Sequence, residues 1–374
     1  MKNEISVYVH LPFCVKKCRY CDFLSGVFDD DLVASYIERL LGEIGFYEKL
    51  IFDREIKTVY FGGGTPSAIP PSFINTIIKK LNGISGFGNG CEISIEMNPG
   101  TVNEEKVKAY LECGINRFSI GLQSVNDNEL AALGRIHSYD DFLYAYDLLR
   151  KNGVSNINVD LMTGIPHETV SSAVRSLESV CRLDPEHISV YTLILEEGTV
   201  FYGMERKDLD LPDEDTGFMI YEETHRILKD HGFERYEISN FAKKGYECRH
   251  NIVYWELGDY IGFGAGAASR LGMHRFSNIH DVKGYISSDG LRLEEDLQLN
   301  ETECMSEYLI MGLRMIRGIS MRSFKKRFGR ELKDVYGDII AKYEKEGLLS
   351  ISDDRLKFTP RGLDLSNIVL KEFV

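Results

Sequence analysis

The feature that most constrains this chain is a sixfold alternation of short β-rich runs with amphipathic segments of helical period. The candidate strands span residues 6–11, 57–61, 92–97, 117–122, 157–161 and 187–193, and helical segments lie between them. Strand–helix alternation of this kind produces a parallel sheet with right-handed crossovers. A doubly wound sheet and a partial TIM-type barrel both fit this pattern.

Polar residues stand where these candidate strands end. They are His10, the run Gly62-Gly63-Gly64-Thr65, Glu96, Gln123 and Asp160. In a barrel the carboxyl ends of the strands converge on one mouth, which is where the chemistry of such folds sits. We therefore predict an α/β fold in which residues 1–235 form a partial (β/α)6 TIM-type barrel. Six units would leave it open on one side, with room for a bulky substrate.

Three cysteines follow the first candidate strand within eight residues. Cys14, Cys18 and Cys21 are too close together to be three independent core cysteines. A loop with this spacing can turn its thiols onto one soft metal centre, such as an iron–sulfur cluster. Two other interpretations remain open from the spacing: a structural zinc site with His10 as fourth ligand, and chance clustering of buried thiols.

The composition narrows the class of protein. The formal net charge of −14 over 374 residues argues against nucleic acid as a partner, since phosphate binding favours a basic surface. No apolar stretch approaches the roughly 20 residues of a membrane span, so we expect at most peripheral membrane contact. Eight cysteines without a disulfide-like pattern are typical of a reducing compartment, and we predict a cytoplasmic protein.

The alternation stops before the last third of the chain. A middle segment, residues 236–299, contains Cys248-Arg249-His250-Asn251 followed by Tyr254-Trp255. Cys248, two residues before His250, is a weak candidate metal ligand. Residues 300–374 read as helices followed by a hairpin at 348–358, which predicts a small C-terminal helical domain of winged-helix type.

Over essentially its whole length the chain resembles the radical S-adenosylmethionine (SAM) superfamily, in its coproporphyrinogen III oxidase-like branch. The resemblance is carried by Cys14-x3-Cys18-x2-Cys21 and by the loop at residues 62–66. It implies a [4Fe-4S] cluster held by these three cysteines, with the fourth iron open to SAM. It also implies SAM contacts from Tyr8, Gly63, Gly64, Thr65, Glu96, Gln123, Arg135 and Asp160.

The second resemblance is to the heme chaperones of this branch, which carry the pattern His250-Asn-x-x-Tyr254-Trp255. It implies heme binding with His250 as axial ligand, and imidazole is a natural ligand of heme iron. The alternative is that His250 is a structural residue of a second hydrophobic core, with its ring nitrogens hydrogen-bonded inside the protein. Ala268 stands where many relatives have histidine, which removes that position as a ligand.

Two functions from different classes follow from the resemblance. The first is a heme chaperone that delivers heme to hemoproteins such as respiratory enzymes. The second is an oxygen-independent coproporphyrinogen III oxidase, which decarboxylates its substrate through a 5′-deoxyadenosyl radical. Phe23 stands where the decarboxylases often carry a fourth cysteine, so we favour the chaperone. The sequence leaves open whether the chain forms a homodimer.

Overall fold

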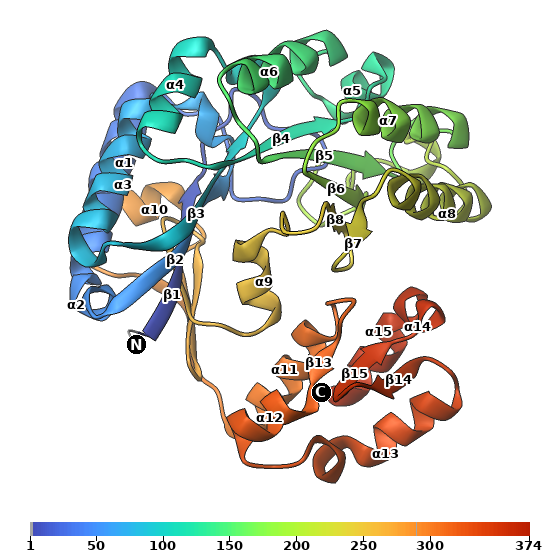
Figure 1. Cartoon of the computed structure of the whole chain (residues 1–374). Helices are drawn as coiled ribbons and strands as arrows, with labels where there is room; N and C mark the ends of the chain where they lie inside the picture. Colours follow the sequence, from blue (N-terminus) through green and yellow to red (C-terminus); the bar gives the residue numbers. More distant parts are fainter. Residues whose placement is uncertain (1–2, 289) are drawn as a thin grey trace.

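The computed structural model describes residues 3–288 and 290–374 and contains one large, open sheet (Figure 1). Its twelve strands run in the order β12-β11-β10-β9-β1-β2-β3-β4-β5-β6-β8-β7. The first six are parallel and each pairs with the next, as predicted. They are β1 (Asn3–Leu11), β2 (Arg54–Gly63), β3 (Phe87–Met97), β4 (Arg117–Gln123), β5 (Ile157–Thr163) and β6 (His187–Thr192).

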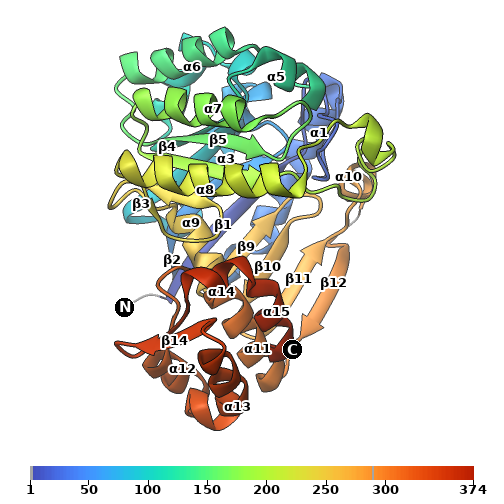
Figure 2. The same ribbon diagram turned by 90° about the vertical axis from the view of Figure 1, so that its right-hand side faces the viewer.

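Helices cover the outer face of this sheet, as Figures 1 and 2 show. On β1 the residues Val7, Val9 and Leu11 face these helices and are fully buried, whereas Tyr8 and His10 face the concave side. The alternation of side chains along a strand thus separates the core from the site. The helices are α1 (Asp30–Phe46), α2 (Glu48–Phe52), α3 (Pro71–Ser85), α4 (Glu104–Glu112), α5 (Asp127–Leu133), α6 (Tyr139–Lys151), α7 (Val170–Arg182) and α8 (Glu214–Asp230).

Residues 236–299, the middle segment of the sequence analysis, add strands to both edges of the sheet. Strand β9 pairs parallel to β1, and the next three strands continue outward in antiparallel order. At the far edge, β8 pairs antiparallel to β6. The elements of this region are β7 (Glu234–Arg235), β8 (Asn240–Ala242), α9 (Arg249–Trp255), β9 (Tyr260–Phe263), β10 (Ala268–Leu271), β11 (His274–Asn278), α10 (Val282–Ser287) and β12 (Leu293–Gln298).

A buried carboxylate ties this extension to the first helix. Glu43 of α1 accepts hydrogen bonds from the Gly264 amide, from Asn278 and from the Tyr285 hydroxyl. Burial raises the pKa of Glu43, and the three donors oppose that rise. A buried carboxyl group is tolerated when its oxygens are hydrogen-bonded in this way. The loop after β9 is therefore fixed against the barrel.

The C-terminal residues form a second hydrophobic core, and its order of elements is that of a winged helix. Strands β13, β15 and β14 form a three-stranded antiparallel sheet. Asp353 and Asp354 form the predicted hairpin tip, and both have positive φ, as a two-residue hairpin turn requires. The elements are α11 (Glu301–Gly312), β13 (Ile319–Ser320), α12 (Met321–Phe328), α13 (Leu332–Lys345), β14 (Leu349–Ser352), β15 (Arg355–Phe358), α14 (Pro360–Asp364) and α15 (Ser366–Leu370).

Basic residues of this C-terminal domain contact α9. The guanidinium of Arg314 lies 5.4 Å from the centre of the Trp255 ring, and Arg317 pairs with Glu256. Arg327 donates to the Leu257 carbonyl at 3.0 Å. These three arginines thus form part of the contact between the C-terminal domain and the segment around α9. Among the described residues, no helix is long and apolar enough to cross a membrane.

Candidate functional site

The loop that carries the three cysteines is fixed by backbone hydrogen bonds at both ends. The Cys14 amide donates to the Gly26 carbonyl at 2.8 Å, and the Gly26 amide donates to Pro12 at 2.9 Å. In the middle of the loop, the Arg19 amide donates to the Leu133 carbonyl at the end of α5. The loop is therefore closed on itself and held against the barrel mouth.

The glycine run after β2 packs directly beneath this loop. A Cβ atom at Gly64 would lie 2.7 Å from the Phe13 amide nitrogen, so no side chain fits there. Gly63 has a φ of +109°, and a Cβ there would lie 2.5 Å from the His10 ring. The next residue, Thr65, donates its amide to the Phe13 carbonyl at 2.7 Å. Glycine is required at Gly64 because two backbones meet at contact distance, and at Gly63 because of its positive φ and the His10 ring beside it.

Cys14, Cys18 and Cys21 line one cavity of about 480 Å³ at the strand ends. Within the described chain, no three His, Cys, Asp or Glu side chains converge closely enough to hold a single metal ion. A [4Fe-4S] cube would offer a separate iron to each of the three thiolates, whereas a single zinc ion takes all its ligands on one centre. Burial raises the pKa of Cys14 and Cys21, so these thiols need the metal to become thiolates.

His10 does not fit the role of a fourth zinc ligand. Its Nδ1 lies 3.0 Å from the Tyr8 hydroxyl, and its Nε2 lies 2.8 Å from the Leu24 carbonyl. The carbonyl accepts only, so Nε2 carries the proton and Nδ1 accepts from Tyr8. Burial lowers the pKa of His10 to about 4, which keeps the ring neutral. His10 thus ties the end of β1 to the cysteine loop.

Seven of the eight predicted SAM residues line the same cavity as the cysteines. These are Gly63, Gly64, Thr65, Glu96, Gln123, Arg135 and Asp160. Tyr8 departs from this set because it lines a second cavity on the β9 side. It stacks on Tyr60, with ring centres 6.3 Å apart, and Tyr60 lines the first cavity. Tyr8 therefore reaches the first cavity only through its neighbour.

The first cavity contains buried polar atoms that lack a hydrogen-bond partner among the described residues. They belong to Asn98, Arg117, Gln123 and Arg135. Buried polar groups are almost always hydrogen-bonded, so orphaned ones in a cavity indicate a polar ligand. The zwitterionic end of an amino-acid-like molecule such as SAM provides both carboxylate and ammonium groups. The predicted residues therefore fit SAM.

Two carboxyl groups, Glu96 and Asp160, and two arginines, Arg117 and Arg135, contribute charge to this cavity. Burial, and then the nearby Asp160, raises the pKa of Glu96 to about 7. Burial also raises the pKa of Asp160, although Ser119 and Asn158 donate to its oxygens. Arg117 shares the cavity and is 2% exposed. Arg117 is not among the residues predicted from the sequence, because it begins its strand rather than ending it.

Two of the cysteine sulfurs have hydrogen-bond donors of their own. The Arg135 guanidinium lies 3.6 Å from Cys18 Sγ and also donates to the Gly121 carbonyl. The Thr65 hydroxyl lies 3.7 Å from Cys14 Sγ. Hydrogen bonds to the sulfurs are one of the means by which a protein sets the reduction potential of a cluster. Arg135 therefore contacts a predicted cluster ligand as well as the cavity.

His250, the heme ligand that the resemblance implies, lies in the core, as in the alternative that the sequence left open. It is 1% exposed, and both of its ring nitrogens are hydrogen-bonded. Nδ1 lies 2.7 Å from Thr58 Oγ1, which donates its own proton to Ser6, and Nε2 lies 2.7 Å from the Tyr254 hydroxyl. As the side chains lie here, His250 has no nitrogen free for an iron atom.

Glu92 completes the attachment of α9 to the sheet. Its carboxylate accepts from the amides of Arg249 and His250 at the start of the helix, at 3.2 and 3.1 Å. A carboxylate at a helix N-terminus satisfies free amides. Cys248 is fully buried beside Glu92 and does not line the cavity of the three cysteines, which argues against a role as cluster ligand.

This attachment places α9 between two cavities. Asn251 lines the first cavity, whereas Tyr254 and Trp255 line the second, which has a volume of about 670 Å³. The cysteine loop joins them, because Asp22 and Phe23 line both. Figure 1 shows α9 on the concave side of the sheet, above the C-terminal domain. The residues of the pattern His250-Asn-x-x-Tyr254-Trp255 thus belong to one short helix that contributes to the walls of both cavities.

An open parallel barrel with three cysteines and a glycine loop at its mouth defines a radical SAM protein. The model of the radical SAM superfamily matches residues 8–180, and that of the HemN C-terminal domain matches residues 299–365. The chain belongs to the HemW family of this superfamily. It is 33% identical to the heme chaperone HemW of Bacillus subtilis, over 99% of both chains.

Two further comparisons extend this result. The chain is 32% identical to the heme chaperone HemW of Escherichia coli, over 99% of this chain and 98% of that one. Among solved structures it is similar to the coproporphyrinogen III oxidase HemN of Escherichia coli, with a TM-score of 0.87. That match covers 100% of this chain and 90% of the other at 23% identity, so it shows the fold alone.

The first prediction concerns the cysteines. Anaerobically prepared protein should contain about four irons and four sulfides per chain. Replacement of Cys14, Cys18 or Cys21 by Ala should remove them, as measured by iron and sulfide assays. Cys181→Ala is the control, because Cys181 is buried in α7 away from the cavity. Stoichiometric zinc without sulfide in the wild type would contradict the assignment.

The second prediction concerns pH. The pKa of Glu96 is about 7, so the carboxylate forms as the pH rises through that value. If the ionised form holds the cationic part of SAM, affinity should rise roughly tenfold between pH 6 and pH 8 relative to Glu96→Gln. Calorimetric titration with SAM measures this affinity. Any change in the protonation of SAM itself affects the wild type and the Glu96→Gln variant equally. Equal pH profiles would remove Glu96 from the SAM contacts.

Proposed function

We propose that this protein is a heme chaperone, which binds heme and delivers it to hemoproteins. The observation that supports the proposal is the pairing of two cavities at one barrel mouth, in a chain that belongs to the HemW family over its full length. The second cavity has the volume and the aromatic lining of a small-molecule site. Respiratory enzymes are the proposed recipients, and a cytoplasmic location stays a prediction from the sequence.

The first cavity would hold a [4Fe-4S] cluster and SAM. Cys14, Cys18 and Cys21 would hold the cluster, and the polar residues of the wall would hold SAM. When bound, the two groups supply one-electron chemistry. The chain contributes donors to two of the sulfurs and a closed cysteine loop. Because Asp22 and Phe23 line both cavities, a ligand in the second would contact the loop that holds the cluster.

The second candidate function is oxygen-independent decarboxylation of coproporphyrinogen III. Its support is the fold that the chain shares with HemN. At 23% identity this similarity shows the fold and does not extend to the substrate. Phe23, which is exposed at the junction of the two cavities, stands where the resemblance implies a fourth cysteine in the decarboxylases. The chaperone is therefore the better supported of the two.

One experiment separates the two functions. Cluster-loaded protein is titrated with hemin, and in parallel it is incubated anaerobically with a reductant, SAM and coproporphyrinogen III. A chaperone should bind about one heme per chain at micromolar concentration and form no decarboxylated product. Product formation without heme binding would replace the chaperone by the decarboxylase.

A further inference from the structure

The second cavity is enclosed by the sheet extension on one side and by α9 and α11 on the other. Alternate residues of neighbouring strands, Tyr260 of β9 together with Ala268 and Arg270 of β10, face into it. Its volume of about 670 Å³ lies within the range of roughly 300–1,000 Å³ for ligand sites. The small side chain of Ala268 leaves this part of the strand face open to a ligand.

Aromatic side chains give the cavity a preference for a flat, apolar ligand. Tyr254 and Tyr260 meet edge to face, with ring centres 4.6 Å apart, and Trp255 lies beside them on α9. The indole Nε1 of Trp255 is buried without a partner among the described residues. A macrocycle with polar substituents matches such a wall, because aromatic faces stack and a buried indole N–H seeks an acceptor.

His280 adds a metal ligand to this wall. It follows β11, is exposed, and makes no hydrogen bond or ion pair with any described residue. Each of the other eight histidines has at least one ring nitrogen hydrogen-bonded: His10, His137, His167, His187, His225, His231, His250 and His274. An unengaged imidazole in an aromatic cavity is suited to an axial site on heme iron.

The backbone that carries His280 is firmly placed. The Gly266 amide donates to the Ile279 carbonyl at 3.0 Å, and the Asn278 amide donates to Ala267 at 2.9 Å. A Cβ atom at Gly266 would lie 3.3 Å from His280 Nδ1, so the imidazole lies against the turn between β9 and β10. This turn is itself fixed by Glu43. A ligand on such a rigid segment is held in position before the iron arrives.

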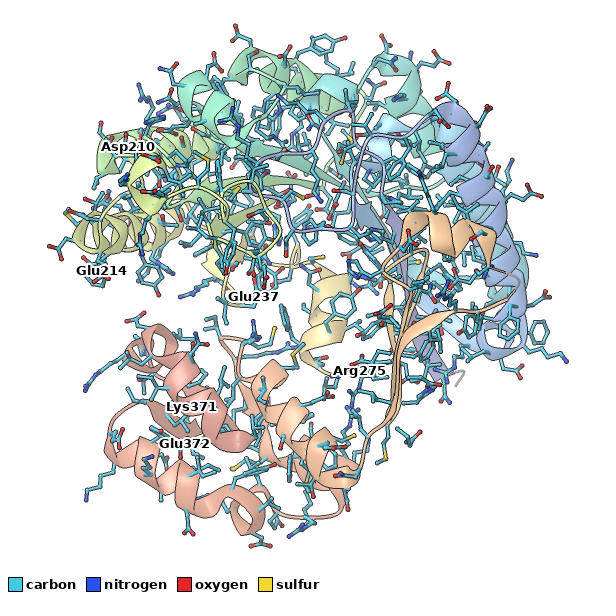
Figure 3. The ribbon with its side chains drawn as sticks, turned by 180° about the vertical axis from the view of Figure 1, so that it is seen from behind. Asp210, Glu214, Glu237, Arg275, Lys371 and Glu372 are labelled. Carbon is cyan, nitrogen blue, oxygen red and sulfur yellow. The ribbon has the colours of Figure 1, made fainter. Side chains whose placement is uncertain are left out.

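The cavity also contains two guanidinium groups, Arg270 and Arg275, together with the carboxylates of Asp22 and Glu307. Arg270 and Arg275 share the carboxylate of Glu307, and Arg275 also pairs with Glu295. The side chain of Arg275 keeps 36% of its surface exposed, so it can turn to a further carboxylate. Figure 3 shows Arg275 on the strand side that faces α9. Guanidinium groups bind carboxylates in bidentate fashion.

We propose that this cavity is the heme site and that His280 is the axial ligand of the iron. The inference rests on the proposed chaperone function and specifies where and how heme binds. In this arrangement His250 is a positioning residue, because its two hydrogen bonds hold α9 and thereby place Tyr254 and Trp255 in the cavity wall. The coordination bond forms between the free imidazole nitrogen and the iron, without any redox step.

The test is a hemin titration of cluster-loaded protein, followed by absorption difference spectra and electron paramagnetic resonance. His280→Ala should lose the histidine-ligated spectrum and at least tenfold in affinity, and added imidazole should restore the spectrum. His274→Ala is the matched control, since His274 lies on β11 and bonds to Asp296. It should behave like the wild type.

A second variant tests the cavity independently of the ligand. Ala268→Trp should fill it and weaken heme binding, while iron and sulfide contents stay unchanged. A wild-type spectrum and affinity in His280→Ala would overturn the assignment of the ligand. Unimpaired binding by Ala268→Trp would overturn the assignment of the cavity. Wild-type protein that binds no heme would instead overturn the proposed function itself.

Discussion

The hydrogen bonds that hold α9 inside the open sheet are the interactions on which both cavities depend. Glu92 accepts from the first amides of the helix, and His250 connects Thr58 of β2 to Tyr254. These contacts are buried, so each lost partner would leave a polar group unsatisfied at a cost of about 1–3 kcal/mol. Burial lowers the pKa of His250 to about 3, so the ring stays neutral and the tautomer is fixed at physiological pH. A seven-residue helix is too short to be stable alone, and this network compensates.

The cavities differ in chemistry because they lie on different parts of one sheet. The first is formed at the ends of parallel strands, where Glu96, Asp160 and Arg117 surround a polar space. The second is formed by the antiparallel extension, where aromatic rings dominate and charges lie at Arg270, Arg275 and Glu307. Phe23 at their junction places an exposed apolar ring between a polar site and an aromatic one. Occupation of one cavity can therefore affect the loop of the other through direct contact.

Much of the barrel and its mouth could be predicted from the sequence, because the signals there are local. Strand–helix alternation predicted β1 to β6. The glycine requirement follows from a contact between two backbones at Gly64, and from the positive φ and the neighbouring His10 ring at Gly63. The burial of His250 could not be predicted, because a pattern of residues does not show on which side of a helix the sheet lies. His280 belongs to no motif, and its importance arises only when the fold brings it to Tyr254 and Trp255. The short strand β9 was missed because it pairs with β1, which is distant in the sequence, and the antiparallel strands β10 to β12 join the sheet through β9.

Cluster and heme are thus expected in separate cavities on either side of α9. Anomalous diffraction at the iron absorption edge, from crystals of the protein loaded with both groups, locates them directly. Two iron positions are expected, one among Cys14, Cys18 and Cys21 and the other beside His280 in the second cavity. A heme iron bound to His250, or at the surface outside the second cavity, would show that this arrangement is wrong.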